Sequence, residues 1–369
     1  MQEFRYVRNM WYAVAFSHEV RPNELMAIKL AGVPLVVWRD KETGVVVAFD
    51  DRCCHKRFPM SDGKLMEDGS LRCAYHGLRY DLTGRCIEIP AQPDKPIPEN
   101  ARLRRIPIKE NEGLIWIWPG NPEQSEKLQV PPTPEIVDQT KDVEFSAGPI
   151  VVEANYVLLI ENLLDTTHFY PLHDGNIGDQ SNSEIDVKYD EGQLPYTPQY
   201  VKTIRDVKSY TLPPYFQRWF KYEVVDRIHT HCMETPAMTR VQFRIAPPGE
   251  LGSATEKGYT LLHLHYPIDH RTLAWRWCVA TGKQPSGSEV SNVAAAMAGD
   301  LPTVIAQDEW VLPRQQKMYE LPEDNYSELF IKTDRAVRRA RQLLLRLQRE
   351  EVGSPSLAEG SSLETSSSP

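Results

Sequence analysis

The chain has 369 residues and a mass of 42.3 kDa, which suits one large domain or two modest ones. Its 51 acidic and 42 basic residues give a net charge of −9, which argues against a nucleic-acid-binding surface or a polybasic membrane anchor. No apolar run approaches the roughly 20 residues of a membrane helix, and the N-terminus lacks the apolar core of a signal peptide. We therefore expect a cytoplasmic protein without nucleic-acid or membrane partners.

Short strands separated by turns dominate the first third of the chain. The β-branched and apolar runs predict strands over residues 26–30, 34–39, 45–49 and 113–118. From residue 119 to residue 134 five prolines interrupt any regular pattern, which indicates a linker. The sequence thus begins with a small β-domain.

The rest of the chain mixes helices with strands. The apolar periodicity predicts helices over residues 156–168, 291–316 (interrupted at Pro302 and Pro313) and 326–349. It predicts strands over residues 240–245, 260–265 and 271–280. Residues 352–369 are rich in serine, glycine and glutamate and have almost nothing to bury, which predicts a disordered tail.

Two pairs of metal-binding residue types lie close together in the β-domain. Cys53 with His55 and Cys73 with His76 form the pattern Cys-x-His-x17-Cys-x2-His. Each pair follows a strand-like run, so two loops at the end of the domain can hold one metal centre between them. Two thiolates and two imidazoles suit either Zn²⁺ or a [2Fe–2S] cluster in which histidines replace two cysteines on one iron.

The order of ligands within each loop favours the cluster. Structural zinc sites commonly take like ligands from each loop. Here each loop supplies one cysteine and one histidine, so both thiolates can bind one iron and both imidazoles the other. Cys54 and Cys86 lie beside this pattern, and we interpret both as packing residues.

A second group of candidate ligands follows about 90 residues later, at Asn162, Asp165, His168 and His173. The first three recur every third residue and share one helix face. His173 lies about 140° further round, so it joins them only if the helix breaks, and Pro171 provides such a break. Two histidines and a carboxylate form the facial triad of a mononuclear non-haem Fe(II) oxygenase. Alone, this spacing also fits two structural histidines, but the upstream pattern favours iron.

Together these motifs resemble the oxygenase component (alpha subunit) of Rieske non-haem iron oxygenases, over residues 4–349. The stretch Tyr75-His76-Gly77-Leu78, the opening Asn9-Met10-Trp11 and the compact length are most similar to the vanillate O-demethylase and dicamba monooxygenase branch. The resemblance implies an α+β fold with an N-terminal all-β Rieske [2Fe–2S] domain at residues 6–120 and a proline-rich linker at 121–140. It further implies a helix-grip-like catalytic domain (an antiparallel sheet with helices) at 141–350, followed by a disordered tail at 351–369.

The same resemblance implies roles for individual residues. Cys53, His55, Cys73 and His76 would bind the cluster, whereas His168 and His173 would bind iron together with a later carboxylate. We choose Asp308 for that carboxylate, with Glu309 and Asp300 as rivals. Asp165 is expected to bridge the histidine ligands of two neighbouring subunits in a homotrimer. Asn162 would tune the iron or bond to the helix backbone.

Substrate contacts are less well defined by the sequence. The candidates are aromatic and imidazole side chains, each of which can equally be a buried structural residue: His229, His231, His263, His265, Trp275, Trp277 and Trp310.

The resemblance implies an O2-dependent terminal monooxygenase. It would carry out oxidative O- or N-dealkylation (demethylation) or hydroxylation of a small aromatic or xenobiotic compound, and the alternative is cis-dihydroxylation of an aromatic ring. No Gly-x-Gly-x-x-Gly motif follows a predicted strand, so the chain is not expected to take hydride from NAD(P)H itself. A separate reductase, with or without a ferredoxin, would supply the electrons.

Overall fold

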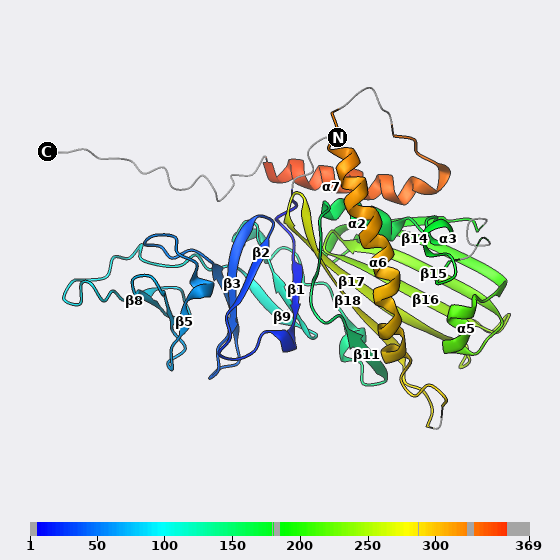
Figure 1. Ribbon diagram of the computed structural model, residues 1–369, viewed down its shortest axis with the longest axis horizontal. Helices are drawn as coiled ribbons and strands as arrows, with labels where there is room; N and C mark the ends of the chain where they lie inside the picture. The colour runs from blue at the N-terminus through cyan, green and yellow to red at the C-terminus, as the bar shows by residue number, and fades with distance from the viewer. Residues whose placement is uncertain (1–5, 179, 181–184, 287, 323–327, 353–369) are drawn as a thin grey trace.

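The structure is a computed structural model that describes residues 6–178, 180, 185–286, 288–322 and 328–352. The molecule is elongated and has two lobes (Figure 1). The N-terminal lobe is built from short strands, and the larger lobe consists of long strands covered by helices. This arrangement confirms the predicted fold class, an all-β N-terminal part followed by an antiparallel sheet with helices.

Three small antiparallel sheets make up the N-terminal lobe. Their strands are β1 (Tyr12–Phe16), β2 (Met26–Leu30), β3 (Val33–Arg39), β4 (Val46–Asp50), β5 (Lys64–Leu65), β6 (Leu71–Arg72), β7 (Arg79–Tyr80), β8 (Cys86–Glu88), β9 (Ile108–Asn111) and β10 (Leu114–Ile117). The sheet orders are β1-β10-β9, β2-β3-β4 and β5-β6-β7-β8. Short 3₁₀ turns lie at η1 (Ser17–Glu19) and η2 (Met60–Asp62). The strands from residue 26 to residue 50 and β10 match the predicted ones closely, because apolar residues, many of them β-branched, dominate them.

The larger lobe is built on one eight-stranded antiparallel sheet. Its strands are β11 (Lys141–Phe145), β12 (Ile150–Val152), β13 (Lys188–Leu194), β14 (Thr197–Thr211), β15 (Val224–Thr235), β16 (Met238–Ala246), β17 (Lys257–Asp269) and β18 (Thr272–Gly282). The spatial order is β11-β18-β17-β16-β15-β14-β13, and β12 also pairs with β18. Because side chains alternate along a strand, one face of this sheet can be buried beneath the helices.

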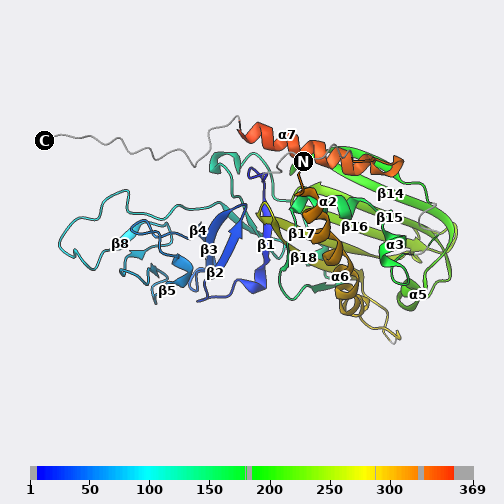
Figure 2. The same cartoon turned by 45° about the horizontal axis from the view of Figure 1, so that its top comes forward.

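Helices cover one face and one edge of the large sheet. They are α2 (Tyr156–Leu164), α3 (Phe169–His173), α5 (Pro214–Phe220), α6 (Val293–Tyr319) and α7 (Arg335–Val352), with η4 (Lys332–Asp334) before α7. In Figures 1 and 2 α6 runs across the face of the sheet, and α7 lies along its upper edge. None of the described helices is both long and apolar enough to cross a bilayer. Residues 121–140 contain η3 (Pro122–Gln124) and α1 (Pro134–Val137), and the predicted domain division there stays a prediction.

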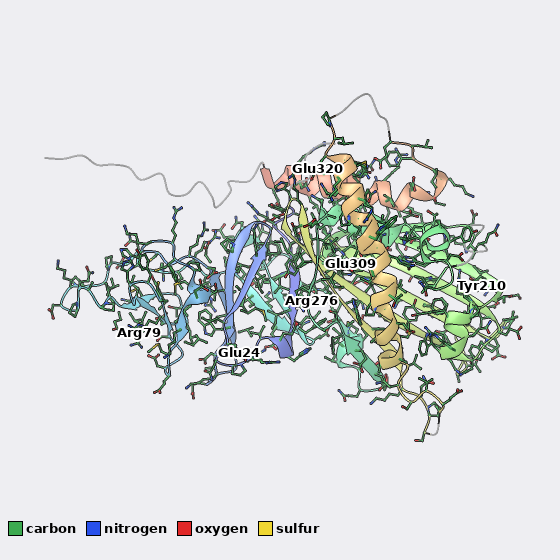
Figure 3. All side chains as sticks on the ribbon, viewed as in Figure 1. Glu24, Arg79, Tyr210, Arg276, Glu309 and Glu320 are labelled. Atoms are coloured by element: carbon green, nitrogen blue, oxygen red, sulfur yellow. The ribbon has the colours of Figure 1, made fainter. Side chains whose placement is uncertain are left out.

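Hydrogen bonds join the two lobes. The Arg276 side chain, labelled in Figure 3, donates from Nε to the Val14 carbonyl at 3.1 Å and from Nη1 to the Glu19 carboxylate at 2.6 Å. The backbone N–H of Ala31 donates to the carbonyl of Pro267 at 2.7 Å. Because Arg276 is only 4% exposed, this junction is part of the folded core.

The end of α7 meets the beginning of the chain. The Glu351 carboxylate accepts hydrogen bonds from the backbone N–H groups of Arg8, at 2.8 Å, and Asn9, at 2.6 Å. Residue 351 therefore belongs to a packed helix, and its assignment to a disordered tail is wrong. The rest of the predicted tail, residues 353–369, lies outside the described residues.

Two of the predicted helices have different bounds. The helix predicted over residues 156–168 ends at Leu164, because the Asp165 carboxylate accepts hydrogen bonds from the backbone N–H and hydroxyl of Thr167 at 2.8 and 2.5 Å. Such a side-chain turn draws the backbone out of the helix. Pro171 therefore does not break the helix. It is the third residue of α3, and a backbone N–H in the first turn of a helix has no carbonyl partner within that helix.

The long helix of the second half is not interrupted at its prolines. α6 passes through Pro302 and Pro313 and continues to Tyr319. One face of α6 is packed into the core by apolar side chains such as Leu301, Ile305 and Leu312, and this burial offsets the cost of about 3 kcal/mol for each proline. The last helix, predicted from residue 326, begins at Arg335 after η4.

Candidate active site

Two matching loops at the tip of the N-terminal lobe carry the first group of candidate ligands. In each loop the cysteine carbonyl accepts a hydrogen bond from the N–H four residues later, from Arg57 at 2.9 Å and from Gly77 at 3.0 Å. Gly77 has a φ of 75°, a conformation that favours glycine. The loops bury the thiols of Cys53 and Cys73, which are 2% and 1% exposed. The fold therefore presents both thiols to the interior.

The two histidines of these loops point the other way. His55 and His76 are exposed, and their ring centroids lie 4.5 Å apart. Two sulfur ligands inside and two nitrogen ligands outside are the arrangement that a [2Fe–2S] cluster with two histidines requires. The four residues thus fit that group, and their roles as ligands stay a prediction.

Hydrogen bonds favour the ionised form of one thiol. The Tyr80 hydroxyl lies 3.1 Å from Cys53 Sγ and 3.2 Å from Cys54 Sγ. Hydrogen bonding from Cys54, and also from Tyr80, lowers the pKa of Cys53 to about 4 despite its burial. Burial raises the pKa of Cys73, so the surrounding residues favour the thiolate form at Cys53 and not at Cys73.

The second group of candidate ligands lies where α2, α3 and α6 meet. The Asp308 Oδ1 atom lies 3.4 Å from His173 Nε2 and 3.8 Å from His168 Nε2. One ligand atom from each residue falls within 4.8 Å of the others. Two imidazole nitrogens and one carboxylate oxygen therefore converge on one point, and this set fits the facial triad of a non-haem Fe(II) site.

Neighbouring side chains orient these ligands. The Asn162 amide donates from Nδ2 to Asp308 Oδ1 at 3.0 Å, and its Oδ1 atom is buried without a hydrogen-bond partner among the described residues. His173 Nδ1 lies 2.8 Å from Gln307 Oε1, so the ring donates there and directs Nε2 toward Asp308. A tight turn at Asp165 allows His168 and His173 to face the same point.

Burial and charge set the protonation of this group. Burial lowers the pKa of His168 and favours the neutral imidazole that binds metals. Burial opposes ionisation of Asp308, but its hydrogen bond with His173 and the charge of His168 outweigh this and lower its pKa. Burial therefore favours a neutral His168, whereas the neighbouring imidazoles favour an ionised Asp308.

The other carboxylates considered for the third ligand lie elsewhere. Glu309, labelled in Figure 3, is the next residue of α6 and is half-buried, but it does not line the cavity beside the triad. Asp300 forms an ion pair with Arg218 at the surface. Among the three acids, Asp308 alone joins the two histidines.

A mostly apolar cavity opens beside this group, between the sheet and α6. Its apolar walls include Phe169, Phe216, Val241, Leu261, Met297 and Leu301. Of the candidate substrate residues, four line it: His229, His231, His263 and Trp275. His265 and Trp277 do not, and Trp310 is 56% exposed on the outer side of α6, so its assignment to the pocket is wrong.

The cavity histidines form a neutral hydrogen-bonded set. His231 Nδ1 donates to the Leu163 carbonyl at 2.7 Å, and its Nε2 atom lies 3.2 Å from His229 Nε2. His263 Nδ1 accepts from Trp275 Nε1 at 3.1 Å, which places the proton of His263 on Nε2. Burial lowers the pKa of His231 and His263 to about 3 and that of His229 well below its ordinary value.

Comparison with known families assigns the two lobes. Residues 10–107 match the Rieske [2Fe–2S] domain, and residues 152–350 match the vanillate O-demethylase oxygenase C-terminal domain. The chain belongs to the vanillate O-demethylase oxygenase family. This confirms the resemblance found in the sequence and identifies the N-terminal lobe of this family member as a Rieske domain.

Curated relatives agree with this assignment. The chain is 34% identical to a toluene-4-sulfonate monooxygenase system iron-sulfur subunit of Comamonas testosteroni, over 49% of this chain and 50% of that protein. It is 25% identical to a vanillate O-demethylase oxygenase subunit of Pseudomonas sp., over 84% and 86%. The chain thus spans about half the length of several curated relatives, including the toluene-4-sulfonate monooxygenase subunit.

The fold is shared with dicamba monooxygenase. The structure of that protein bound to 3,6-dichlorosalicylic acid superposes with a TM-score of 0.83 and 22% identity, covering 94% of this chain and 99% of that chain. An identity this low establishes the fold and nothing more.

Sequence reasoning missed several residues near the site. Gln307 gives no signal because it is one polar residue on a long helix, although its place next to Asp308 could have suggested a role. Tyr215 and Tyr259 line the cavity from α5 and β17, and their contribution depends on packing rather than on a motif. Arg205 is buried in β14, opposite His229 of β15, and carries a charge that no sequence pattern marked.

Proposed function

We propose that this chain is the terminal oxygenase of a multicomponent Rieske monooxygenase. It would oxidatively remove O- or N-alkyl groups from a small aromatic compound, or hydroxylate such a compound. The observation that carries the proposal is the convergence of His168, His173 and Asp308 at the wall of an apolar cavity. The names of the curated relatives, which are monooxygenase components, support the same reaction class.

Two metal groups are proposed, each with its own ligand set. The cluster would be held by Cys53, His55, Cys73 and His76, and Fe(II) by His168, His173 and Asp308. Bound there, the two groups would supply single electrons and the activation of O2.

The side chains around the triad hold and orient its ligands. Gln307 fixes the tautomer of His173, and Asn162 holds the carboxylate oxygen of Asp308. The apolar cavity walls exclude water from the reacting carbon. For an O-methyl substrate, ROCH3, O2, two electrons and two protons give ROH, formaldehyde and water, with the electrons coming from NAD(P)H through a separate reductase.

The arrangement of the lobes supports a homotrimer. The sheet that carries the cluster loops lies at one end of the molecule, and α3 lies at the other (Figures 1 and 2). Electron transfer within one chain would have to cross its whole length, whereas head-to-tail contact would bring the cluster of one subunit to the iron of the next. In that contact the Asp165 carboxylate would bridge His76 of one chain and His168 of the other.

Replacing the bridging carboxylate tests this assembly. Asp165→Asn keeps an oxygen to accept from Thr167, so we expect the turn and both metals to persist while turnover falls about 100-fold. Asp206→Asn is the matched control, because Asp206 is an exposed acid paired with Lys188. An Asp165→Asn enzyme that turns over at the wild-type rate would contradict the bridge.

The electron-transfer partners and the compartment belong to the same proposal. We propose a separate reductase, with or without a ferredoxin, as the electron donor. None of the six cysteines, all of which lie in the described part of the chain, forms a disulfide, and this supports the proposal of a reducing, cytoplasmic compartment.

Product analysis tests the reaction itself. The purified holoenzyme, a surrogate reductase and NADH are offered methoxy-, N-methyl- and unsubstituted aromatics, and products are analysed by mass spectrometry with formaldehyde detection. We expect dealkylated product with one formaldehyde per turnover. Diols without formaldehyde would replace the proposal with ring dihydroxylation.

A further inference from the structure

Cys54 is a thiol that the proposed ligand set leaves unused. It directly follows Cys53 in the first cluster loop, and it is the only exposed one of the six cysteines, all of which belong to the described residues. Because the residue is exposed, it does not serve the packing role expected from the sequence. Its sulfur nevertheless contacts a specific group, the hydroxyl of the buried Tyr80.

The Tyr80 hydroxyl contacts two sulfur atoms at once. Its oxygen lies 3.1 Å from Cys53 Sγ and 3.2 Å from Cys54 Sγ, and each contact is a hydrogen bond in which either atom could be the donor. Tyr80 lies in β7 and is 0% exposed, and Cys53 is 2% exposed. Three polar atoms therefore meet behind the first cluster loop, and one of them belongs to a proposed cluster ligand.

The number of protons decides which of these atoms donate when Cys53 binds a metal. A cysteine binds metal as a thiolate, so Cys53 then carries no proton and only accepts. The Tyr80 hydroxyl and the Cys54 thiol carry one proton each. Tyr80 is therefore the donor to Cys53, and Cys54 donates its own proton to Tyr80 or, as the neighbouring residue, to Cys53 itself.

Both routes of donation stabilise negative charge on Cys53 Sγ. Reduction of a [2Fe–2S] cluster adds one negative charge, and hydrogen bonds to the ligand sulfurs help to set the reduction potential because they favour the reduced form. Hydrogen bonds in a chain also polarise one another, so a proton that Cys54 gives to Tyr80 strengthens the bond from Tyr80 to Cys53. The two routes therefore change the potential in the same direction.

We propose that Cys54 is a positioning residue that raises the reduction potential of the cluster by supplying a second side-chain proton to Cys53 Sγ, directly or through Tyr80. The thiol itself binds no metal in this role. The cluster then accepts an electron from the reductase more readily and passes it on with a smaller driving force. This assignment rests on the proposed function, because it requires Cys53 to be a cluster ligand.

Redox titration of the holoenzyme tests the proposal. Cys54→Ala removes the proton, and we expect the one-electron reduction equilibrium constant of the cluster to fall about threefold, as for the loss of one weak hydrogen bond. At 59 mV per tenfold change this is a fall in potential of about 28 mV. Cys54→Ser keeps a donor and should stay at or above the wild-type potential. Cys86→Ala is the matched control and should leave the potential unchanged, because this thiol of the same lobe donates to the Glu88 carbonyl at 3.4 Å.

Alkylation gives an independent test that does not depend on the folding of a variant. Because Cys54 is the exposed thiol, iodoacetamide should modify it first in the folded holoenzyme, and peptide mass spectrometry verifies the position of the adduct. A thioether has no proton to donate, so the alkylated protein should show the potential of Cys54→Ala. The same treatment of Cys54→Ser should leave its potential unchanged.

Two outcomes overturn the proposal. The first is one common potential for the wild type, Cys54→Ala and the alkylated protein. The second is an equal loss of potential in Cys54→Ser and Cys54→Ala, which would mean that the sulfur atom matters and its proton does not. The proposed function is judged separately, by the visible and electron paramagnetic resonance spectra of the wild type. A Rieske spectrum with a potential independent of Cys54 keeps the proposed function and removes this inference, whereas a holoenzyme preparation without a cluster spectrum removes both.

Discussion

A buried ion pair joins α7 to the helix that carries the triad's supporting residues. Arg341 on α7 donates to both carboxylate oxygens of Glu161 on α2, at 2.5 and 2.6 Å. The Glu161 side chain is 7% exposed and that of Arg341 is 14% exposed. Glu161 directly precedes Asn162, whose amide donates to Asp308. The ion pair between Arg341 and Glu161 therefore fixes the turn of α2 that carries Asn162.

Replacing Arg341 with methionine should destabilise the protein strongly. Burial raises the pKa of Glu161 even with Arg341 beside it, so the intact pair adds little net stability. Without Arg341 the carboxylate remains buried and unpaired, at a cost of about 3–5 kcal/mol. For a domain of about 200 residues this corresponds to a fall in melting temperature of roughly 6–20 °C.

Calorimetry of two variants checks this reasoning. Arg341→Met is compared with a double variant that also carries Glu161→Leu, which removes the buried charge and leaves two apolar side chains. We expect the double variant to regain at least half of the lost melting temperature. Glu328, which also pairs with Arg341, is 36% exposed and can turn to solvent in both variants.

Either of two results would refute the argument. If Arg341→Met melts within about 2 °C of the wild type, Glu161 is not effectively buried. If the double variant is less stable than the single one, the loss arises from packing of the arginine stem rather than from an unpaired carboxylate.

Two more predictions concern the histidines. Burial lowers the pKa of three imidazoles to about 3, below the ordinary 6.5, namely those of His231, His263 and His265. Their contribution to stability is therefore complete above about pH 6.5 and is lost as the pH falls toward 3. Melting curves at pH 7.5, 6 and 5 should show about 2 kcal/mol of destabilisation per histidine at pH 5, and a flat profile would count against this prediction. Gln307→Leu removes the acceptor for His173 Nδ1 and should weaken iron binding about 10- to 100-fold in chelator competition without altering the cluster spectrum; unchanged retention of iron would contradict it.

The part of each site that is local in sequence could be predicted. Cys53 and His55 share one loop, and His168 and His173 lie within one turn and a short helix, so spacing alone brings them together. The break between those helices was assigned to the wrong residue. Asp165 followed by two threonines is itself a turn signal, because an aspartate side chain can replace the helical hydrogen bond.

The distant parts depend on packing that a single sequence does not display. The hydrogen bond between Asn162 and Asp308 joins residues 146 positions apart. The choice of Asp308 as the third iron ligand rests on the family resemblance rather than on spacing. β14 was not predicted at all, because neither set of alternate residues along it is consistently apolar. Whether Arg205 is buried or faces solvent is decided by the register of β14 on β15, and a shift of one residue would reverse it.

The contact between Glu351 and the start of the chain constrains how the protein is made. Arg8 and Asn9 leave the ribosome long before Glu351, because the carboxylate that accepts from their N–H groups is translated more than 340 residues later. Ala31 likewise waits for the carbonyl of Pro267. The N-terminal lobe therefore reaches its final structure only after synthesis of α7, and until then its first residues depend on water or on chaperones for their hydrogen bonds.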